Sequence, residues 1–201
     1  MMTQTEATIY LSERRIPSEI GLKTELDGVV VFDNILAPNQ SYELVVEADS
    51  QVLVLPYIGD LEIVGANLLE ENQIQFFTEI GNFKIQNPYT DDAINFFEIH
   101  IQNQTLELPK NTFTLDFTAN LNQLISISDK IQIGQFGLRE EGVFTLQNPE
   151  NKVFVYAIEG AFEAQNRLIQ PRDGLQLQFL EDVEFEALSD NAIILFIELN
   201  Q

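Results

Sequence analysis

The feature that most limits the fold of this chain is a two-residue alternation of apolar and polar side chains in many short segments. These segments are rich in Ile, Val and Phe, are bounded by Gly, Asn, Asp or Pro, and lie at residues 7–11, 42–46, 52–55, 83–85, 96–101, 112–117, 131–136, 143–146, 153–158, 161–164, 174–179, 183–187 and 193–199. The alternation predicts β-strands, and many short strands predict an all-β sandwich or barrel. No long amphipathic helix is indicated, and residues 18–26 are the most helix-tolerant stretch.

A weak internal repeat divides these strands into two sets. When Gly59 is placed on Gly160, a shift of 101 residues, the apolar positions of the two halves stay in phase. The shift falls to 98 where residues 96–101 meet residues 194–199. The alternative explanation is chance, because the apolar positions of two unrelated β-rich segments can also be aligned in this way. The repeat favours two β-barrels of one architecture, at residues 1–105 and 106–201, joined through the Gln- and Asn-rich residues 102–111.

The charge of the chain excludes several classes of partner. Lys and Arg number 10 against 32 Asp and Glu, which gives a net charge of −22. Such a surface repels nucleic acids and anionic membranes, and it favours a basic protein as a macromolecular partner. The N-terminus is polar, and no apolar run reaches the ~18 residues of a membrane span. We therefore expect a cytoplasmic protein without a secretory signal.

The sequence has no cysteine and one histidine, His100, and this composition excludes several kinds of functional site within these 201 residues. Disulfides, thiolate nucleophiles, zinc–thiolate sites, iron–sulfur clusters and multi-histidine metal sites cannot be built from this composition. The glycine-rich motifs of dinucleotide, ATP and serine-hydrolase sites are not present in the sequence. Acidic pairs such as Glu70-Glu71 lack calcium-loop spacing, and we expect them in solvated turns.

The second half of the chain carries a family resemblance. Residues 153–164 read Val-Phe-Val-Tyr-Ala-Ile-Glu-Gly-Ala-Phe-Glu-Ala, residues 171–175 contain an Asp-Gly turn, and residues 188–199 close with Ile-Leu-Phe-Ile-Glu-Leu. This half resembles the C-terminal cupin of the pirin and quercetin 2,3-dioxygenase-like bicupins. Residues 9–14, 32–40 and 94–101 are similar to parts of the first cupin of that family. The resemblance implies two antiparallel β-barrels of the double-stranded β-helix, or jelly-roll, type.

The resemblance also implies where a metal would be held. Members of the family bind a divalent metal, usually iron, through a His-x-His pair and a His-x-Glu pair in the N-terminal cupin. In this sequence those positions fall at about Val45 and Glu47, and at about Ile85 and Asn87. Imidazoles and carboxylates are the ligands that hold such a metal. Only Glu47 is suited to the task, so we expect no metal and no other cofactor.

Glu98 and His100 are the most reactive pair in the sequence. They lie two residues apart in an expected strand and therefore share one face. One interpretation is a general base and its carboxylate partner; the other, which we favour, is a packed ring that replaces another flat side chain. The adjacent Arg14 and Arg15 have two interpretations as well. They could bind a carboxylate ligand or a partner, or they could form a solvated edge or a salt bridge between the domains, which we favour.

The remaining residues favour the binding of a small polar ligand as the function. Tyr57, Gln86 and Tyr89 are expected near the mouth of the first barrel, together with Glu47, Asn87, Glu98 and His100, where they would bind by hydrogen bonds and stacking. The alternative is a barrel filled by side chains, because the chain has 15 Phe and no Trp. The expected filling is Phe76, Phe77, Phe83 and Phe97.

Three functions follow from these observations. The first is a non-catalytic, metal-free pirin-like bicupin that acts by binding a small molecule or a protein. The second is a metal-dependent oxygenase of the quercetinase type with an atypical site around Glu47 and Asn87. The third is a purely structural or oligomeric protein whose barrels are both filled.

Overall fold

The computed structural model describes residues 5–102, 104 and 106–201, which divide into two compact all-β units. The N-terminal unit is Arg15–Leu115 and contains two antiparallel sheets. The larger sheet has seven strands in the order β12 (Phe113–Thr114), β9 (Gln73–Phe77), β6 (Ser50–Ile58), β11 (Ile94–Gln102), β4 (Val29–Leu36), β3 (Gly21–Leu26) and β2 (Ile16–Pro17). The smaller has the order β5 (Ser41–Val46), β10 (Gly81–Gln86), β7 (Leu61–Ile63) and β8 (Leu68–Leu69).

The C-terminal unit comprises Met1–Arg14 and Asp116–Gln201. Its larger sheet has six strands in the order β1 (Glu6–Tyr10), β19 (Gly174–Gln178), β16 (Lys152–Glu159), β21 (Ala192–Leu199), β14 (Ile131–Phe136) and β13 (Gln123–Ser126). Its smaller sheet has the order β15 (Glu141–Thr145), β20 (Asp182–Ala187), β17 (Phe162–Ala164) and β18 (Arg167–Ile169). A single 3-10 turn, Ser12–Arg14, follows β1. None of the described residues forms a helix long and apolar enough to cross a membrane.

The internal repeat of the sequence is confirmed by the order of the strands. A shift of 101 residues carries β7, β9 and β10 onto β17, β19 and β20, and β11 and β21 begin 98 residues apart. The smaller sheets, β5-β10-β7-β8 and β15-β20-β17-β18, then have the same strand order. The two halves therefore share one architecture although few of their residues are identical.

Each unit is held together by the apolar faces of its two sheets. Among the described residues all four sheets are open at both edges, so the expected barrels do not close through hydrogen bonds. The sheets instead bury alternate side chains against each other, which is the packing of a two-sheet β-structure. The C-terminal core is rich in aromatic rings: Phe144 stacks on Phe196 at 4.9 Å, and Phe185 meets Phe136 edge-on at 5.0 Å.

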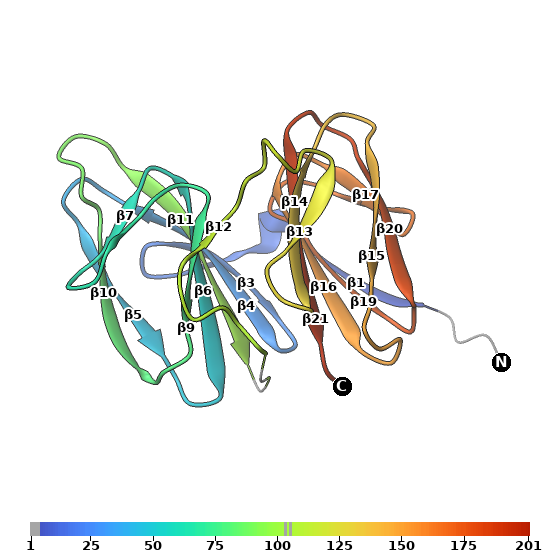
Figure 1. The fold of residues 1–201 in the computed structure, drawn as a ribbon, viewed down its shortest axis with the longest axis horizontal. Helices are drawn as coiled ribbons and strands as arrows, with labels where there is room; N and C mark the ends of the chain where they lie inside the picture. The colour runs from blue at the N-terminus through green and yellow to red at the C-terminus, as the bar shows by residue number, and fades with distance from the viewer. Residues whose placement is uncertain (1–4, 103, 105) are drawn as a thin grey trace. The chain divides into compact units, whose positions relative to one another are not determined.

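The division of the chain differs from the expected boundary between residues 105 and 106. β1 pairs antiparallel with β19, from Glu6 opposite Gln178 to Tyr10 opposite Gly174, so the first strand completes the C-terminal unit. Figure 1 shows this blue strand running beside the orange β19. At the other boundary β12 pairs with β9, which keeps the chain in the N-terminal unit as far as Leu115. Of the expected connecting residues 102–111, residues 103 and 105 lie outside those described.

Two local expectations need correction. The helix-tolerant residues 18–26 contain a strand, β3, because it pairs along its length with β4. β4 itself was not among the expected strands, although its start, Val-Val-Val-Phe, has strong β propensity. Its polar middle, Asp33-Asn34, breaks the apolar pattern. Those two polar side chains are used in contacts described below.

The turn that follows β16 predicts a specific sensitivity to substitution. Gly160 has φ +68°, and a Cβ at this position would lie 2.7 Å from the Cβ of Ala192. We expect Gly160→Ala to lower the free energy of unfolding by about 1–3 kcal/mol, through backbone strain and this clash. Gly65→Ala is the matched control, because Gly65 has φ +85° but no atom within 4 Å of a built Cβ. Urea unfolding of both variants measures the difference, and equal losses would contradict the close packing at Gly160.

Candidate functional site

The family resemblance places the first pair of metal positions in strand β5 and at the residue that follows it. Leu44 and Val46 point into the N-terminal unit and are 0% and 1% exposed, whereas Val45 is 44% exposed. Glu47 is exposed after the end of β5. Successive residues of a strand face opposite sides of the sheet. The expected placement of Val45 and Glu47 in the interior is therefore wrong by one residue, and the interior positions carry aliphatic side chains.

The second pair of positions has different surroundings. Ile85 is fully buried in the same apolar core as Leu44 and Val46. Asn87 is also buried, and its side-chain amide donates to three carbonyl oxygens, those of Leu36, Ala37 and Asp92, at 3.0, 3.1 and 2.8 Å. The amide of Asn87 therefore ties the loop after β10 to the end of β4.

The residues at these positions do not fit a transition metal. The inward-facing side chains of Leu44, Val46 and Ile85 have no donor atom, and a metal of this kind needs imidazole or carboxylate ligands. In the part of the chain that the structure describes, no three His, Asp or Glu side chains come close enough to hold a metal ion.

The two tyrosines expected at the mouth of the first barrel lie apart. The ring of Tyr57 contacts Phe97 at 5.7 Å, and Phe97 is on the opposite face of the sheet from Glu98. Tyr89 lies against the interior, where its hydroxyl donates to Asp60 Oδ2 at 3.0 Å and accepts from the Asp60 amide at 3.1 Å. Tyr89 thus fixes the turn between β6 and β7. Gln86 ends β10 and is half-buried.

The structure does bring Glu98 and His100 together. They follow one another on the inner face of β11, and His100 Nε2 lies 2.5 Å from Glu98 Oε1. The Glu98 side chain is 1% exposed and that of His100 is 13% exposed. Asn34 adds a second donor, from its Nδ2 to Glu98 Oε2 at 3.2 Å. A buried carboxylate is stabilised only when it has such partners.

Tyr42 completes this cluster from the facing sheet. It lies on β5 on the same side as Leu44 and Val46, and its hydroxyl forms a hydrogen bond with Glu98. Burial raises the pKa of the Tyr42 phenol above its ordinary value, and the negative charges of Glu98 and Glu19 raise it further. The phenol therefore remains a proton donor to the carboxylate at neutral pH.

Sequence reasoning found Glu98 and His100 but missed Tyr42 and Asn34. The signal for Tyr42 is its two-residue spacing from Leu44 and Val46, which places all three on one face. The signal for Asn34 is a polar residue within the apolar run of β4. Chemically, the cluster is an imidazole oriented by a carboxylate whose two oxygens already accept other donors.

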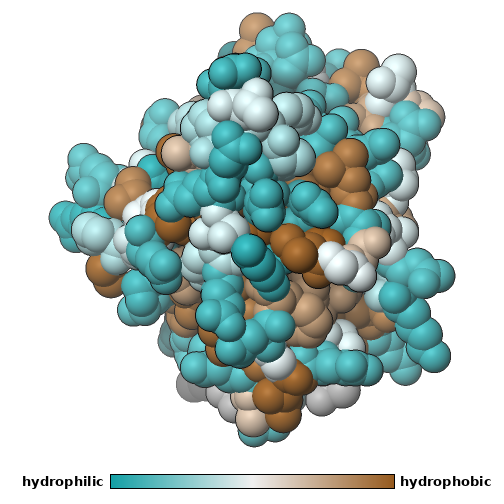
Figure 2. All heavy atoms as spheres, turned by 90° about the vertical axis from the view of Figure 1, so that its left-hand side faces the viewer, coloured by the Kyte–Doolittle hydropathy of each residue, from teal (hydrophilic) through white to brown (hydrophobic). Residues whose placement is uncertain are grey.

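A separate pocket opens between the sheets of the N-terminal unit. Its volume is about 290 Å³, and its lining residues are Ile63, Ala66, Asn67, Gln75, Phe76, Phe77, Thr78, Glu79, Phe83 and Lys110. The rings of Phe77 and Phe83 meet at 4.7 Å and form its apolar wall. Figure 2 looks from the side on which β5, β7 and β10 are drawn in Figure 1, and shows a mostly hydrophilic surface with separate hydrophobic patches.

The expected filling of the first barrel is correct for only two of its four phenylalanines. Phe77 and Phe83 belong to the core of the N-terminal unit. Phe76 pairs with Leu53 and Phe97 with Leu55, which places both on the other face of the large sheet. Arg15 also acts within this unit, where its guanidinium pairs with Asp33 at 2.7 Å.

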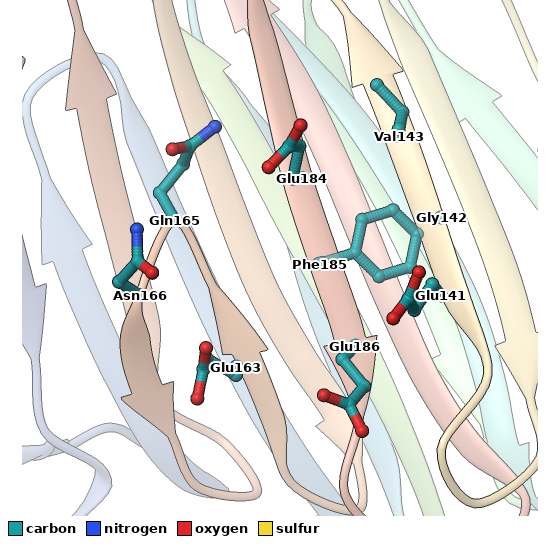
Figure 3. Close-up of a pocket in the computed structure, with 9 residues that line it drawn as sticks. All are labelled: Glu141, Gly142, Val143, Glu163, Gln165, Asn166, Glu184, Phe185 and Glu186. Carbon is teal, nitrogen blue, oxygen red and sulfur yellow. The ribbon is translucent and has the colours of Figure 1, made fainter.

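The smaller sheet of the C-terminal unit has a strongly acidic outer face. A concavity of about 380 Å³ lies over it, and Figure 3 shows the carboxylates of Glu141, Glu163, Glu184 and Glu186 around it. Glu186 stands directly opposite Glu141 on one side and Glu163 on the other. Arg139 offsets part of this charge through a 2.7 Å ion pair with Glu186.

The shifted pKa of Tyr42 leads to a prediction about alkaline pH. Because the phenol ionises at a higher pH in the folded chain, its contribution to stability is complete below a pH of about 10 and is lost as the pH rises further. We expect Tyr42→Phe to be less stable than the native chain at pH 8, through the lost hydrogen bond to Glu98. The difference should shrink above pH 10. Urea unfolding between pH 8 and pH 11 measures it, and a pH-independent difference would contradict the assignment.

The opposed carboxylates of Glu141, Glu186 and Glu163 on the C-terminal unit lead to a prediction about the effect of salt on stability. Like charges directly opposite each other on neighbouring strands destabilise a sheet. We expect Glu163→Gln to raise the free energy of unfolding at low ionic strength, by at most about 1 kcal/mol. The gain should fall in ~1 M salt, where exposed charges are screened. Thermal unfolding at both salt concentrations tests this, and Glu62→Gln on the N-terminal unit is the control for net charge.

Comparison with known proteins agrees with this architecture. Residues 120–199 match the family model described as the quercetinase C-terminal cupin domain. YhhW from Escherichia coli has a similar structure, with a TM-score of 0.72, 14% identity, and coverage of 98% of this chain and 99% of that one. A structure of the same bacterial pirin in complex with nickel(II) has a TM-score of 0.69, 12% identity and coverage of 97% and 99%.

A third similar structure is quercetin 2,3-dioxygenase from Acinetobacter baumannii, with a TM-score of 0.62, 11% identity, and coverage of 98% of this chain and 79% of that one. No curated protein matches the sequence. At these identities the structures establish the fold, and the family model adds a sequence match over β13 to β21. Residues 120–199 are therefore similar to a quercetinase C-terminal cupin domain, and the whole chain has a fold similar to that of a bacterial pirin and of a quercetin 2,3-dioxygenase.

Proposed function

We propose that this chain is a non-catalytic bicupin that binds a small molecule in its N-terminal unit. The observation that carries the proposal is the pocket of about 290 Å³ beside Phe77 and Phe83. Small-molecule sites are concave, mostly apolar, and provided with a few polar groups, and they start at ~300 Å³. This pocket is an open concavity with an apolar wall and with the polar side chains of Asn67, Thr78 and Lys110 around it.

The donor chemistry supports binding over metal-assisted oxidation. The interior residues of β5 and β10 closest to the expected metal positions are the aliphatic Leu44, Val46 and Ile85, so an oxygenase would need ligands from elsewhere in the unit. Among the described residues of the unit Glu98 is the one buried carboxylate, and His100, Asn34 and Tyr42 already occupy its oxygens. We assign this cluster to the stability of the unit, in keeping with the interpretation of His100 as a packed ring.

The difference between the two units supports a division of roles within a bicupin. In the C-terminal unit Phe136, Phe144, Phe185 and Phe196 contact one another across the core. The N-terminal core has smaller aliphatic side chains at many of its positions, and the pocket opens beside it. The C-terminal unit thus serves as a filled support. A cytoplasmic location and a basic protein partner remain predictions from composition.

Ligand screening with a blocked variant tests the proposal. Ala66 lines the pocket and is exposed, so Ala66→Trp should fill the pocket without loss of core packing. A ligand at 100 times its Kd adds about 2.7 kcal/mol of stability, which raises the Tm of a chain of this size by roughly 5–10 °C. We expect such a rise in the native chain and its loss in Ala66→Trp.

Metal analysis separates the alternatives. The chain is purified from medium that contains iron, nickel, manganese and copper, and the metal content per chain is then measured. We expect far less than one metal per chain. A content close to one transition-metal ion per chain would contradict the non-catalytic interpretation and favour the oxygenase. If no compound raises the Tm and no metal is bound, the structural alternative, with both units filled, takes its place.

A further inference from the structure

The pocket of the N-terminal unit carries two opposite charges at its rim. Glu79 follows β9 and Lys110 lies before β12, and both side chains are exposed at the pocket. Neither forms a salt bridge within 4 Å to any residue that the structure describes. Both charges are therefore free to meet a ligand.

The wall of the pocket limits the size and polarity of a ligand. The half-buried ring of Phe83 supplies the exposed apolar surface, and the nearly buried side chains of Ile63 and Phe77 lie behind it; the two rings are tilted by 56°. Gln75 is already bound, because its Oε1 accepts from the Thr112 hydroxyl at 2.9 Å. A volume of about 290 Å³ is at the lower limit for organic ligands, and suits one ring or one branched chain with a short polar end.

The charge of the whole chain limits the ligand further. With a net charge of −22, the surface potential repels a simple organic anion and attracts an amine. A simple amine, however, would leave Lys110 at the rim with a like charge beside it. A ligand that carries one ammonium group and one carboxylate can pair its carboxylate with Lys110 and its ammonium with Glu79. Its net charge is zero, so the negative surface potential does not repel it.

Resting on the proposed binding function, we propose that the pocket takes the zwitterion of an apolar α-amino acid. The side chain of the ligand, aromatic or branched, packs on Phe77 and Phe83. Its carboxylate faces Lys110 and its ammonium faces Glu79. The polar side chains of Asn67 and Thr78 complete the rim.

Three probes of nearly equal size test this assignment by calorimetry. L-Phenylalanine carries both charges, 3-phenylpropanoate lacks the ammonium, and 2-phenylethylamine lacks the carboxylate. We expect L-phenylalanine to bind most tightly, with each analogue at least about threefold weaker, the change expected for a partly exposed charge pair. Lys110→Gln should remove the advantage over 2-phenylethylamine, and Glu79→Gln should remove the advantage over 3-phenylpropanoate.

Matched variants control for net charge. Lys84 and Glu43 lie on β10 and β5 of the same unit, are exposed, and do not line the pocket. Lys84→Gln and Glu43→Gln should leave the order of the three probes unchanged. An analogue that binds the native chain as tightly as L-phenylalanine would overturn the assignment, as would rim variants that behave like their controls.

The outcome also separates this inference from the proposed function on which it rests. If the three probes fail and another compound raises the Tm of the native chain but not of Ala66→Trp, the amino-acid assignment is wrong and binding at the pocket stands. If no compound distinguishes the native chain from Ala66→Trp, both are wrong. Binding of L-phenylalanine that Ala66→Trp abolishes supports both.

Discussion

The structure depends on the burial of alternate side chains between two facing sheets in each unit. A single strand cannot hide its apolar side from water, so each sheet is stable only when a second sheet covers it. Because neighbouring residues on a strand face opposite ways, a shift of one residue exchanges the core for solvent. This exchange decides that Leu44 and Val46 are buried and Val45 is exposed. The chemistry available inside the N-terminal unit follows from it.

Much of the fold could be predicted from the sequence because its physical signals are local. Alternation and turn residues located most strands, and the phase of the apolar positions revealed the repeat that relates β9 to β19. The place of β1 could not be found in this way. Its partner, β19, is more than 160 residues away, and no local pattern tells a strand which sheet edge it will join. The pairing of β12 with β9 could not be predicted for the same reason.

The candidate site was predictable only where residues lie close in the sequence. Glu98 and His100 share a strand, so their contact followed from spacing alone. Tyr42 and Asn34 reach the same carboxylate from two other strands, and their approach depends on how the sheets pack. Lys110 and Glu79 both line the pocket, and no sequence motif relates them. The family resemblance placed Val45 among the metal positions, but Val45 is exposed and its neighbours Leu44 and Val46 are buried, because a shift of one residue in a strand changes the face.

The pairing of β1 with β19 also has a consequence for the order in which this chain acquires its structure during synthesis. Residues 6–10 leave the ribosome long before their hydrogen-bonding partners, residues 174–178. All strands of the N-terminal unit lie within Arg15–Leu115, so that unit can form while β1 still waits as an unpaired edge. The large sheet of the C-terminal unit is thus completed by a strand translated more than 160 residues before its partner, and pairings of such long sequence separation are slow to form.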